Sequence, residues 1–97
     1  MAQYDVHQSA DTLLLDCQSD LLNNFNTRFV VPLLPPDLAP LPAGRLNPAF
    51  QIEGETYIMA TQFASAIETH RLGAVLASLA GQDRQIMNAL DVLLTGV

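Results

Sequence analysis

Residues 83–96, Asp-Arg-Gln-Ile-Met-Asn-Ala-Leu-Asp-Val-Leu-Leu-Thr-Gly, form the clearest pattern in the chain. Asp83 is a suitable N-cap and Gly96 a suitable C-terminal cap, so the segment has both boundaries of a helix. Its apolar residues recur at the helical positions i, i+3, i+4, i+7 and i+8, namely Ile86, Ala89, Leu90, Leu93 and Leu94. The spacing therefore predicts a C-terminal amphipathic helix whose stripe serves both the core and the seam of a dimer.

The segments before this helix favour strands. Residues 3–7 alternate apolar and polar side chains, and residues 12–17 are largely apolar, which predicts two strands joined by a turn. Residues 27–33 contain a β-branched run typical of a central strand, and residues 50–60 predict a hairpin with Gly54 in its turn. Strands followed by a terminal helix indicate an α+β fold with a small, barrel-like sheet.

Three further segments have weaker patterns. Residues 18–26 are polar and Asn-rich, and we expect a loop that buries the three large apolar side chains it carries, Leu21, Leu22 and Phe25. Residues 35–44 hold so many prolines that an extended surface loop is expected. Residues 74–80, between Gly73 and Gly81, are apolar and predict a short helical piece.

Charge is scarce and negative along the 97 residues. The chain has ten Asp and Glu, four Arg and no Lys, which gives a net charge of −6, and 49% of its residues are hydrophobic. That apolar content excludes a disordered acidic tail, and the lack of cations argues against a protein that grips a phosphate backbone. A chain this short hides apolar area poorly, so the surplus predicts an interface with a second copy.

No catalytic, cofactor or metal motif stands out. His7, Cys17 and His70 lack metal-ligand spacing, and His7 is expected to be an exposed strand residue. Cys17 is expected to be an inert core thiol, with a pKa raised by the carboxylates of Asp16 and Asp20. The N-terminus has no signal-peptide pattern and no apolar stretch is long enough to span a membrane, so a cytoplasmic protein is expected.

An ordered set of short strings runs through the chain. They are Asp-Cys-Gln-Ser-Asp-Leu-Leu at 16–22, Arg-Phe-Val-Val-Pro-Leu at 28–33, Leu-Asn-Pro at 46–48, Ile-Glu-Gly-Glu at 52–55, Asn-Ala-Leu-Asp at 88–91 and Thr-Gly-Val at 95–97. In this order and spacing the chain resembles the CcdB family, the toxin half of a bacterial plasmid-addiction (toxin–antitoxin) module. The resemblance spans essentially the whole chain, which we expect to be a single domain over residues 1–97.

The resemblance implies a fold and a mode of action. The fold is a small SH3-like antiparallel β-barrel with a C-terminal α-helix, shared with the MazF-type ribonuclease toxins. CcdB proteins are not enzymes. They form homodimers, with the C-terminal helices near the two-fold axis. They bind the A subunit of DNA gyrase and trap it on cleaved DNA. A CcdA-like antitoxin neutralises the dimer with a disordered tail. The pair represses its own operon through the antitoxin, so the toxin associates with operator DNA only indirectly.

The resemblance also assigns the gyrase contacts to the last three residues. The family has Trp, Gly and Ile there, and this chain has Thr95, Gly96 and Val97. Gly96 matches and Val97 is a conservative change, but Thr95 lacks the stacking surface of Trp. Losing such an anchor costs about 2–4 kcal/mol at an interface hot spot, or roughly 30- to 1,000-fold in affinity.

Three functions therefore stay open. The first is a gyrase-poisoning toxin, and the second is an antitoxin-binding protein with weak or no poisoning because of Thr95. The third, a MazF-type ribonuclease, is disfavoured because RNA cleavage needs cations to hold phosphate. The sequence does not identify the antitoxin contacts, for which Arg45, Leu46 and the Pro-rich segment are the only candidates it offers.

Overall fold

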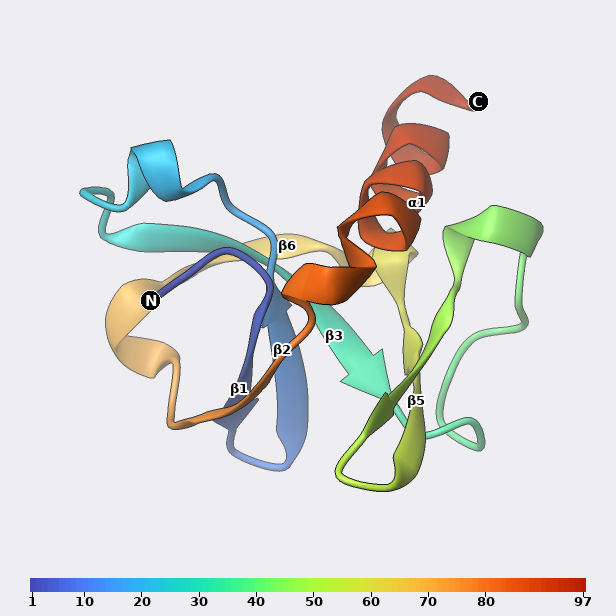
Figure 1. Ribbon diagram of the computed structural model, residues 1–97, viewed down its shortest axis with the longest axis horizontal. Helices are drawn as coiled ribbons and strands as arrows, with labels where there is room; N and C mark the ends of the chain where they lie inside the picture. The colour runs from blue at the N-terminus through green and yellow to red at the C-terminus, as the bar shows by residue number, and fades with distance from the viewer.

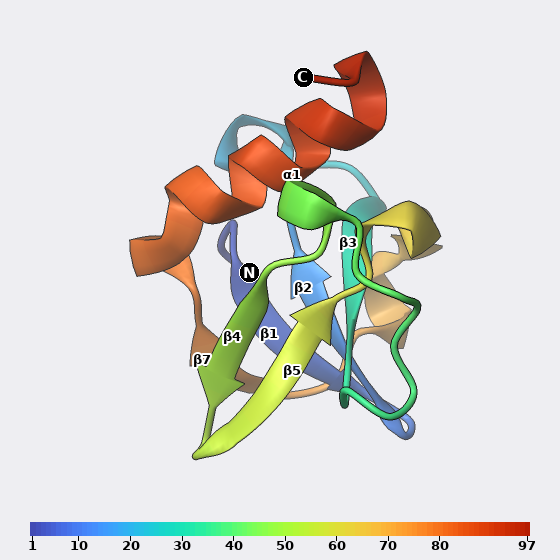
Figure 2. The same cartoon turned by 90° about the vertical axis from the view of Figure 1, so that its right-hand side faces the viewer.

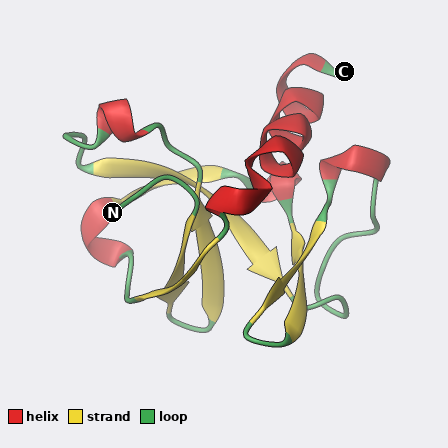
Figure 3. Cartoon of the chain, in the orientation of Figure 1, coloured by secondary structure: helices red, strands yellow, loops and turns green.

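Seven antiparallel strands precede one α-helix in the computed structural model, which describes residues 1–97 (Figures 1 and 3). The strands are β1 (Asp5–Ser9), β2 (Thr12–Asp16), β3 (Thr27–Leu34), β4 (Ala49–Ile52), β5 (Glu55–Met59), β6 (Ser65–Glu68) and β7 (Val75–Ser78). The helix is α1 (Asp83–Thr95), and short 3₁₀ turns connect the rest: η1 (Asp20–Leu22), η2 (Gly44–Leu46), η3 (Thr61–Phe63), η4 (Thr69–Arg71) and η5 (Ala80–Gln82). The predicted α+β fold is confirmed.

Strand β3 organises the sheet because it pairs along both of its edges. One edge pairs with β2, and the other pairs first with β6 and then with β5. The order β4-β5-β3-β2-β1-β7, with β6 beside β3, wraps the sheet into a nearly closed barrel. Figure 2 shows α1 lying across one end of this barrel, over the strands.

Two tight turns set the registers of the hairpins. The β1–β2 turn contains Ala10 in a left-handed conformation, with φ of 52°. The β4–β5 turn places Glu53 and Gly54 at φ of 52° and 83°, as a two-residue type I′ turn requires, and glycine adopts this region at no steric cost. The hairpin predicted over residues 50–60 is therefore confirmed.

The core lies between the inner face of the sheet and the first turns of α1. Its members come from β1, β2, β3, β4 and β5 as well as from α1, and Val6, Leu15, Val31, Met59, Ile86 and Ala89 have no exposed surface. Burying each large aliphatic side chain contributes about 1.5–3 kcal/mol, so the helix is held by its packing. Its buried residues are Ile86, Ala89 and Leu90.

Two predictions about local structure are wrong. Residues 75–78 form strand β7 and not a helical piece, because β1 offers an unpaired edge on which they complete a ladder. Asp83 is the first residue of α1 and not its N-cap, because the turn η5 leads directly into the helix from Gln82. The Asp83 carboxylate in the first turn still interacts favourably with the positive end of the helix dipole.

Candidate partner-binding surface

The C-terminal end of α1 projects beyond the barrel. Leu93, Leu94 and Val97 are 37%, 73% and 75% exposed, and Thr95 and Gly96 are exposed as well. Gly96 ends the helix in the left-handed conformation, with φ of 80°, and its N–H donates to the Val92 carbonyl at 3.0 Å. The predicted C-terminal cap is confirmed, and it fixes the direction in which the last residue leaves the helix.

The stripe of α1 is therefore split between two environments. Ile86, Ala89 and Leu90 are buried, as predicted for a core-facing stripe. Leu93 and Leu94 are not buried in the single chain, and Met87 on the same helix is also 43% exposed. The second half of the stripe, together with the last three residues, is thus an apolar surface that the barrel leaves uncovered.

Thr95 uses its polar group within its own helix. Its hydroxyl donates to the Asp91 carbonyl at 2.7 Å, one turn earlier. This bond ties the side chain to the helix backbone, as is common for threonine in helices. The position consequently offers a methyl group to a partner and no broad stacking surface.

A second apolar surface lies on the loop between β2 and β3, and the prediction that this loop buries its apolar side chains is wrong. Leu21, Leu22 and Phe25 are 92%, 42% and 54% exposed. Figures 1 and 2 show this loop, with η1 in blue, at the same end of the molecule as the tip of α1. Figure 1 shows η1 and the helix tip apart from each other along the longest axis, so they are two separate apolar surfaces, and exposed apolar surfaces are typical of protein-binding sites.

Polar contacts hold this loop in place without burying its leucines. Ser19 caps η1 by accepting from the Leu21 N–H at 3.1 Å, and Asp20 accepts from the Gln3 N–H at 2.8 Å. The Gln18 amide donates to the carbonyls of Leu22 and Thr27 and accepts from the Phe29 N–H. Because hydrogen bonds fix the backbone, the apolar side chains are free to face outward.

A buried ion pair anchors the base of the same loop. The Arg28 Nε donates to Asp16 Oδ2 at 2.9 Å. The Arg28 Nη2 lies 2.7 Å from the same oxygen and forms an ion pair with it, but its N–H groups are not aligned for a hydrogen bond. The Arg28 Nη1 donates to the Asn23 Oδ1 at 2.6 Å, and the Gln18 N–H donates to Asp16 Oδ1. The pair thus connects β2, β3 and the exposed loop through one guanidinium group.

Of the remaining candidate residues, His7 and Cys17 are buried. His7, predicted to be exposed, is buried at 2% exposure, because the segment that leads into β7 runs alongside β1, and its Nδ1 lies 3.1 Å from the Gly73 carbonyl in that segment. Cys17 is buried, and burial together with the Asp16 carboxylate raises the pKa of its thiol from 9.0 to about 12, as the prediction of an inert core thiol requires. His70 is exposed.

Neither a metal cluster nor a membrane span emerges from these residues. No group of three or more His, Cys, Asp or Glu side chains is placed to hold a metal ion. The one α-helix, α1, is too short and too polar to cross a membrane.

The structure thus combines a small antiparallel barrel, one helix across its end, and apolar side chains exposed at the helix tip and on the η1 loop, and exposed apolar side chains are typical of protein-binding surfaces. The chain matches the family model described as CcdB protein over residues 3–96, and it therefore belongs to the CcdB family. Membership makes it a toxin of the toxin–antitoxin class, in a family whose partners are antitoxins and gyrase. A search of the curated proteins found no match.

Proposed function

We propose that this protein is a homodimeric, cytoplasmic toxin that binds the DNA gyrase A subunit, traps the gyrase–DNA cleavage complex, and is neutralised by a cognate antitoxin. The observation that carries the proposal is the exposed helix tip, where Gly96 and Val97 stand at the positions of the family's gyrase contacts. The exposed loop with Leu21 and Leu22 adds apolar area at the same end of the molecule.

The homodimer is supported by the half of the α1 stripe that the single chain leaves uncovered. Leu93 is 37% exposed and Leu94 is 73% exposed, and a second copy would cover this half of the stripe by packing its own helix alongside. Sedimentation at several concentrations tests this directly. We expect a dimer for the natural chain and a monomer for Leu94→Glu, whereas Gln85→Glu, which adds the same charge at another exposed helix position, should remain dimeric.

A second function, antitoxin binding with weak or no poisoning, is favoured by one observation. Thr95 stands where the family has Trp, and its hydroxyl is bonded back to Asp91. Without an aromatic anchor at the tip, gyrase binding is expected to be weaker by roughly 30- to 1,000-fold, while contacts with an antitoxin elsewhere are unaffected.

The ribonuclease alternative is disfavoured by the charges. Of the four Arg, Arg28 is buried against Asp16, which leaves Arg45, Arg71 and Arg84 on a surface that carries nine other carboxylates. Phosphate binding needs clustered cations, and this surface is net negative. Incubation of the pure protein with long RNA is expected to leave the RNA intact.

Induction in growing cells tests the proposed function. We expect growth to stop, with cleaved DNA covalently attached to gyrase, and growth to resume when the cognate antitoxin is co-expressed. Thr95→Trp is expected to strengthen the effect. Normal growth with both the natural chain and Thr95→Trp would contradict gyrase poisoning at the helix tip.

A further inference from the structure

The segment before β1 bends sharply at Tyr4. This residue is buried and has a φ of 72°, a left-handed conformation that an aromatic residue rarely adopts. The Tyr4 N–H donates to the Asp16 carbonyl at 2.5 Å, and the Tyr4 carbonyl accepts from the Leu79 N–H at 2.8 Å. Backbone strain of this kind persists only where the surrounding structure imposes it. The two hydrogen bonds therefore fix the path of the chain just before β1.

Gln3, next to this bend, contacts the η1 loop, which joins β2 to β3, with both its backbone and its side chain. The Gln3 N–H donates to Asp20 Oδ1 at 2.8 Å, and the Gln3 Nε2 donates to the Cys17 carbonyl at 3.1 Å. A tight turn holds Gln3 from behind, because the Asp5 N–H donates to the Ala2 carbonyl at 3.1 Å and the Ala2 N–H donates to Asp5 Oδ2 at 3.0 Å. Gln3 thus joins two points of the loop that follow it by 14 and 17 residues.

The turn η1 itself is held by polar contacts. None of its three residues is buried, so core packing does not hold it, and a 3₁₀ turn has poorer hydrogen-bond geometry than an α-helix. Its other hydrogen bonds are made with residues of the same loop, namely Gln18, Ser19 and Phe25. The bond from the Gln3 N–H to Asp20 is therefore the one hydrogen bond that ties η1 to a segment outside its own loop.

We propose that Gln3 is a positioning residue for the η1 loop, and that its two hydrogen bonds hold the loop in the orientation that presents Leu21 and Leu22 to a partner. Gln3 acts through Asp20 and the Cys17 carbonyl and not through a contact of its own with the partner. A loop that is already ordered loses less conformational freedom on binding, so the partner binds it more tightly. The role of this loop in gyrase binding rests on the proposed function, whereas its attachment to Gln3 does not.

NMR hydrogen exchange of the free protein tests whether Gln3 holds the loop. The Leu21 and Leu22 amides are the probes, because both donate to Ser19 and exchange when η1 opens. Gln3→Met keeps the length of the side chain and removes its donor, and Asp20→Ala removes the acceptor of the backbone bond. We expect each variant to raise both exchange rates about threefold to tenfold. Asp20→Asn keeps an acceptor oxygen and should exchange nearly as slowly as the natural chain.

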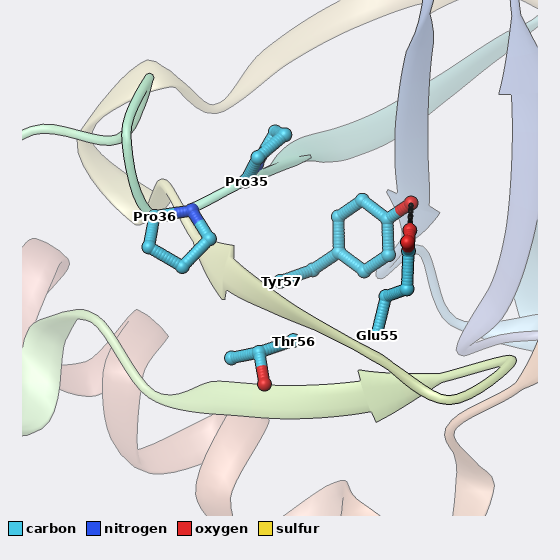
Figure 4. Close-up of a pocket in the computed structure, with 5 residues that line it drawn as sticks. All are labelled: Pro35, Pro36, Glu55, Thr56 and Tyr57. Carbon is cyan, nitrogen blue, oxygen red and sulfur yellow. Dashed lines mark hydrogen bonds between the residues drawn. The ribbon is translucent and has the colours of Figure 1, made fainter.

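Glu55→Ala is the matched control for Asp20→Ala. Glu55 is also an exposed carboxylate that accepts one hydrogen bond, from the Tyr57 hydroxyl at 3.5 Å (Figure 4), and Figure 1 shows its strand β5 away from η1. Its removal should leave the exchange of η1 unchanged. Calorimetry with the gyrase A subunit should give an affinity about threefold to tenfold weaker for Gln3→Met and Asp20→Ala and an unchanged affinity for Glu55→Ala. Urea denaturation should give nearly equal unfolding free energies for all these variants, which separates a lost position of the loop from a lost fold.

Three results would overturn the proposal. The first is unchanged exchange of η1 in both Gln3→Met and Asp20→Ala, and the second is equally fast exchange in Glu55→Ala. The third is faster exchange with unchanged gyrase affinity, because the order of the loop would then not matter for binding. Absence of gyrase binding by the natural chain would instead contradict the proposed function, and the exchange rates of the free protein would then decide the role of Gln3 on their own.

Discussion

The carboxylate of Asp16 and the guanidinium of Arg28 form an ion pair with 2.7 Å between Oδ2 and Nη2, and the two side chains are 0% and 1% exposed. The pair links neighbouring strands β2 and β3 and, through Asn23, fixes the loop that carries the exposed leucines. It is thus one of the connections between the barrel and the η1 loop of the candidate binding surface.

Breaking this pair by removing one partner should be strongly destabilising. Arg28→Met leaves the Asp16 carboxylate buried and uncompensated, which typically costs about 3–5 kcal/mol of unfolding free energy. Urea denaturation measures the loss, and Arg71→Met, at an exposed arginine, is the matched control with little effect. The double variant Arg28→Met with Asp16→Leu should regain much of the stability. A loss of unfolding free energy in the double variant equal to the sum of the losses in the two single variants would contradict the pairing.

Gly73 should be the glycine least tolerant of substitution. A Cβ added there would clash with the backbone carbonyl of Gln8, which accepts from the Gly73 N–H at 2.8 Å. Gly73→Ala is therefore expected to lose about 2 kcal/mol or more. Gly81→Ala is the control, since a Cβ there meets nothing within 4 Å. Thermal unfolding of the two variants measures the difference, and equal midpoints would contradict this account of the β1–β7 contact.

Stability should fall as the pH rises above 9. Burial and the Asp16 carboxylate raise the pKa of the Cys17 thiol from 9.0 to about 12, so in this range the unfolded chain releases a proton that the folded chain keeps. Fewer protons are then bound in the unfolded state, and the free energy of unfolding decreases, by about 1 kcal/mol near pH 10. Urea titrations at pH 7 and pH 10 measure the loss.

The control for this pH dependence is Cys17→Val, which keeps an apolar side chain and removes the titrating thiol. Its unfolding free energy should change less between the two pH values, although burial also raises the pKa of Tyr4, which keeps a smaller dependence in place. A slope as steep as that of the natural chain would show that Cys17 does not carry the effect.

Leu21 should matter for binding and not for stability. The side chain is 92% exposed, so Leu21→Ser is expected to change the unfolding free energy by no more than about 0.5 kcal/mol. If the η1 loop belongs to the gyrase-binding surface, the Leu21→Ser variant loses affinity for the gyrase A subunit. Leu41→Ser is the matched control, because Leu41 is 91% exposed but lies on the Pro-rich loop. Equal affinity of the two variants would exclude the η1 loop from the interface.

The sequence pattern predicted the elements that depend on local signals. The helical spacing of Ile86, Ala89 and Leu90 and the Glu53-Gly54 turn specify a helix and a hairpin without reference to the rest of the chain. The pattern could not reveal β7, because residues 75–78 are a strand only where the edge of β1 is available to pair with them.

The candidate binding surface was only half predictable for the same reason. The resemblance indicated the helix tip, but Leu21, Leu22 and Phe25 were expected in the core, where leucine and phenylalanine are usually found. Their exposure follows from the contacts of Gln18, Ser19 and the Asp16–Arg28 pair, which hold the loop by polar groups. Two adjacent leucines in a polar, Asn-rich loop fit neither the helical nor the strand hydrophobic period. This was the signal in the sequence that could have indicated an exposed apolar surface.

Titration calorimetry of the purified protein with the gyrase A subunit tests the central claim most directly. We expect the natural chain to bind, Thr95→Trp to bind more tightly by up to roughly 1,000-fold, and a chain without Val97 to bind more weakly. Absence of binding by both the natural chain and Thr95→Trp, with both folded and dimeric, would contradict the claim that the tip of α1 is a gyrase-binding site.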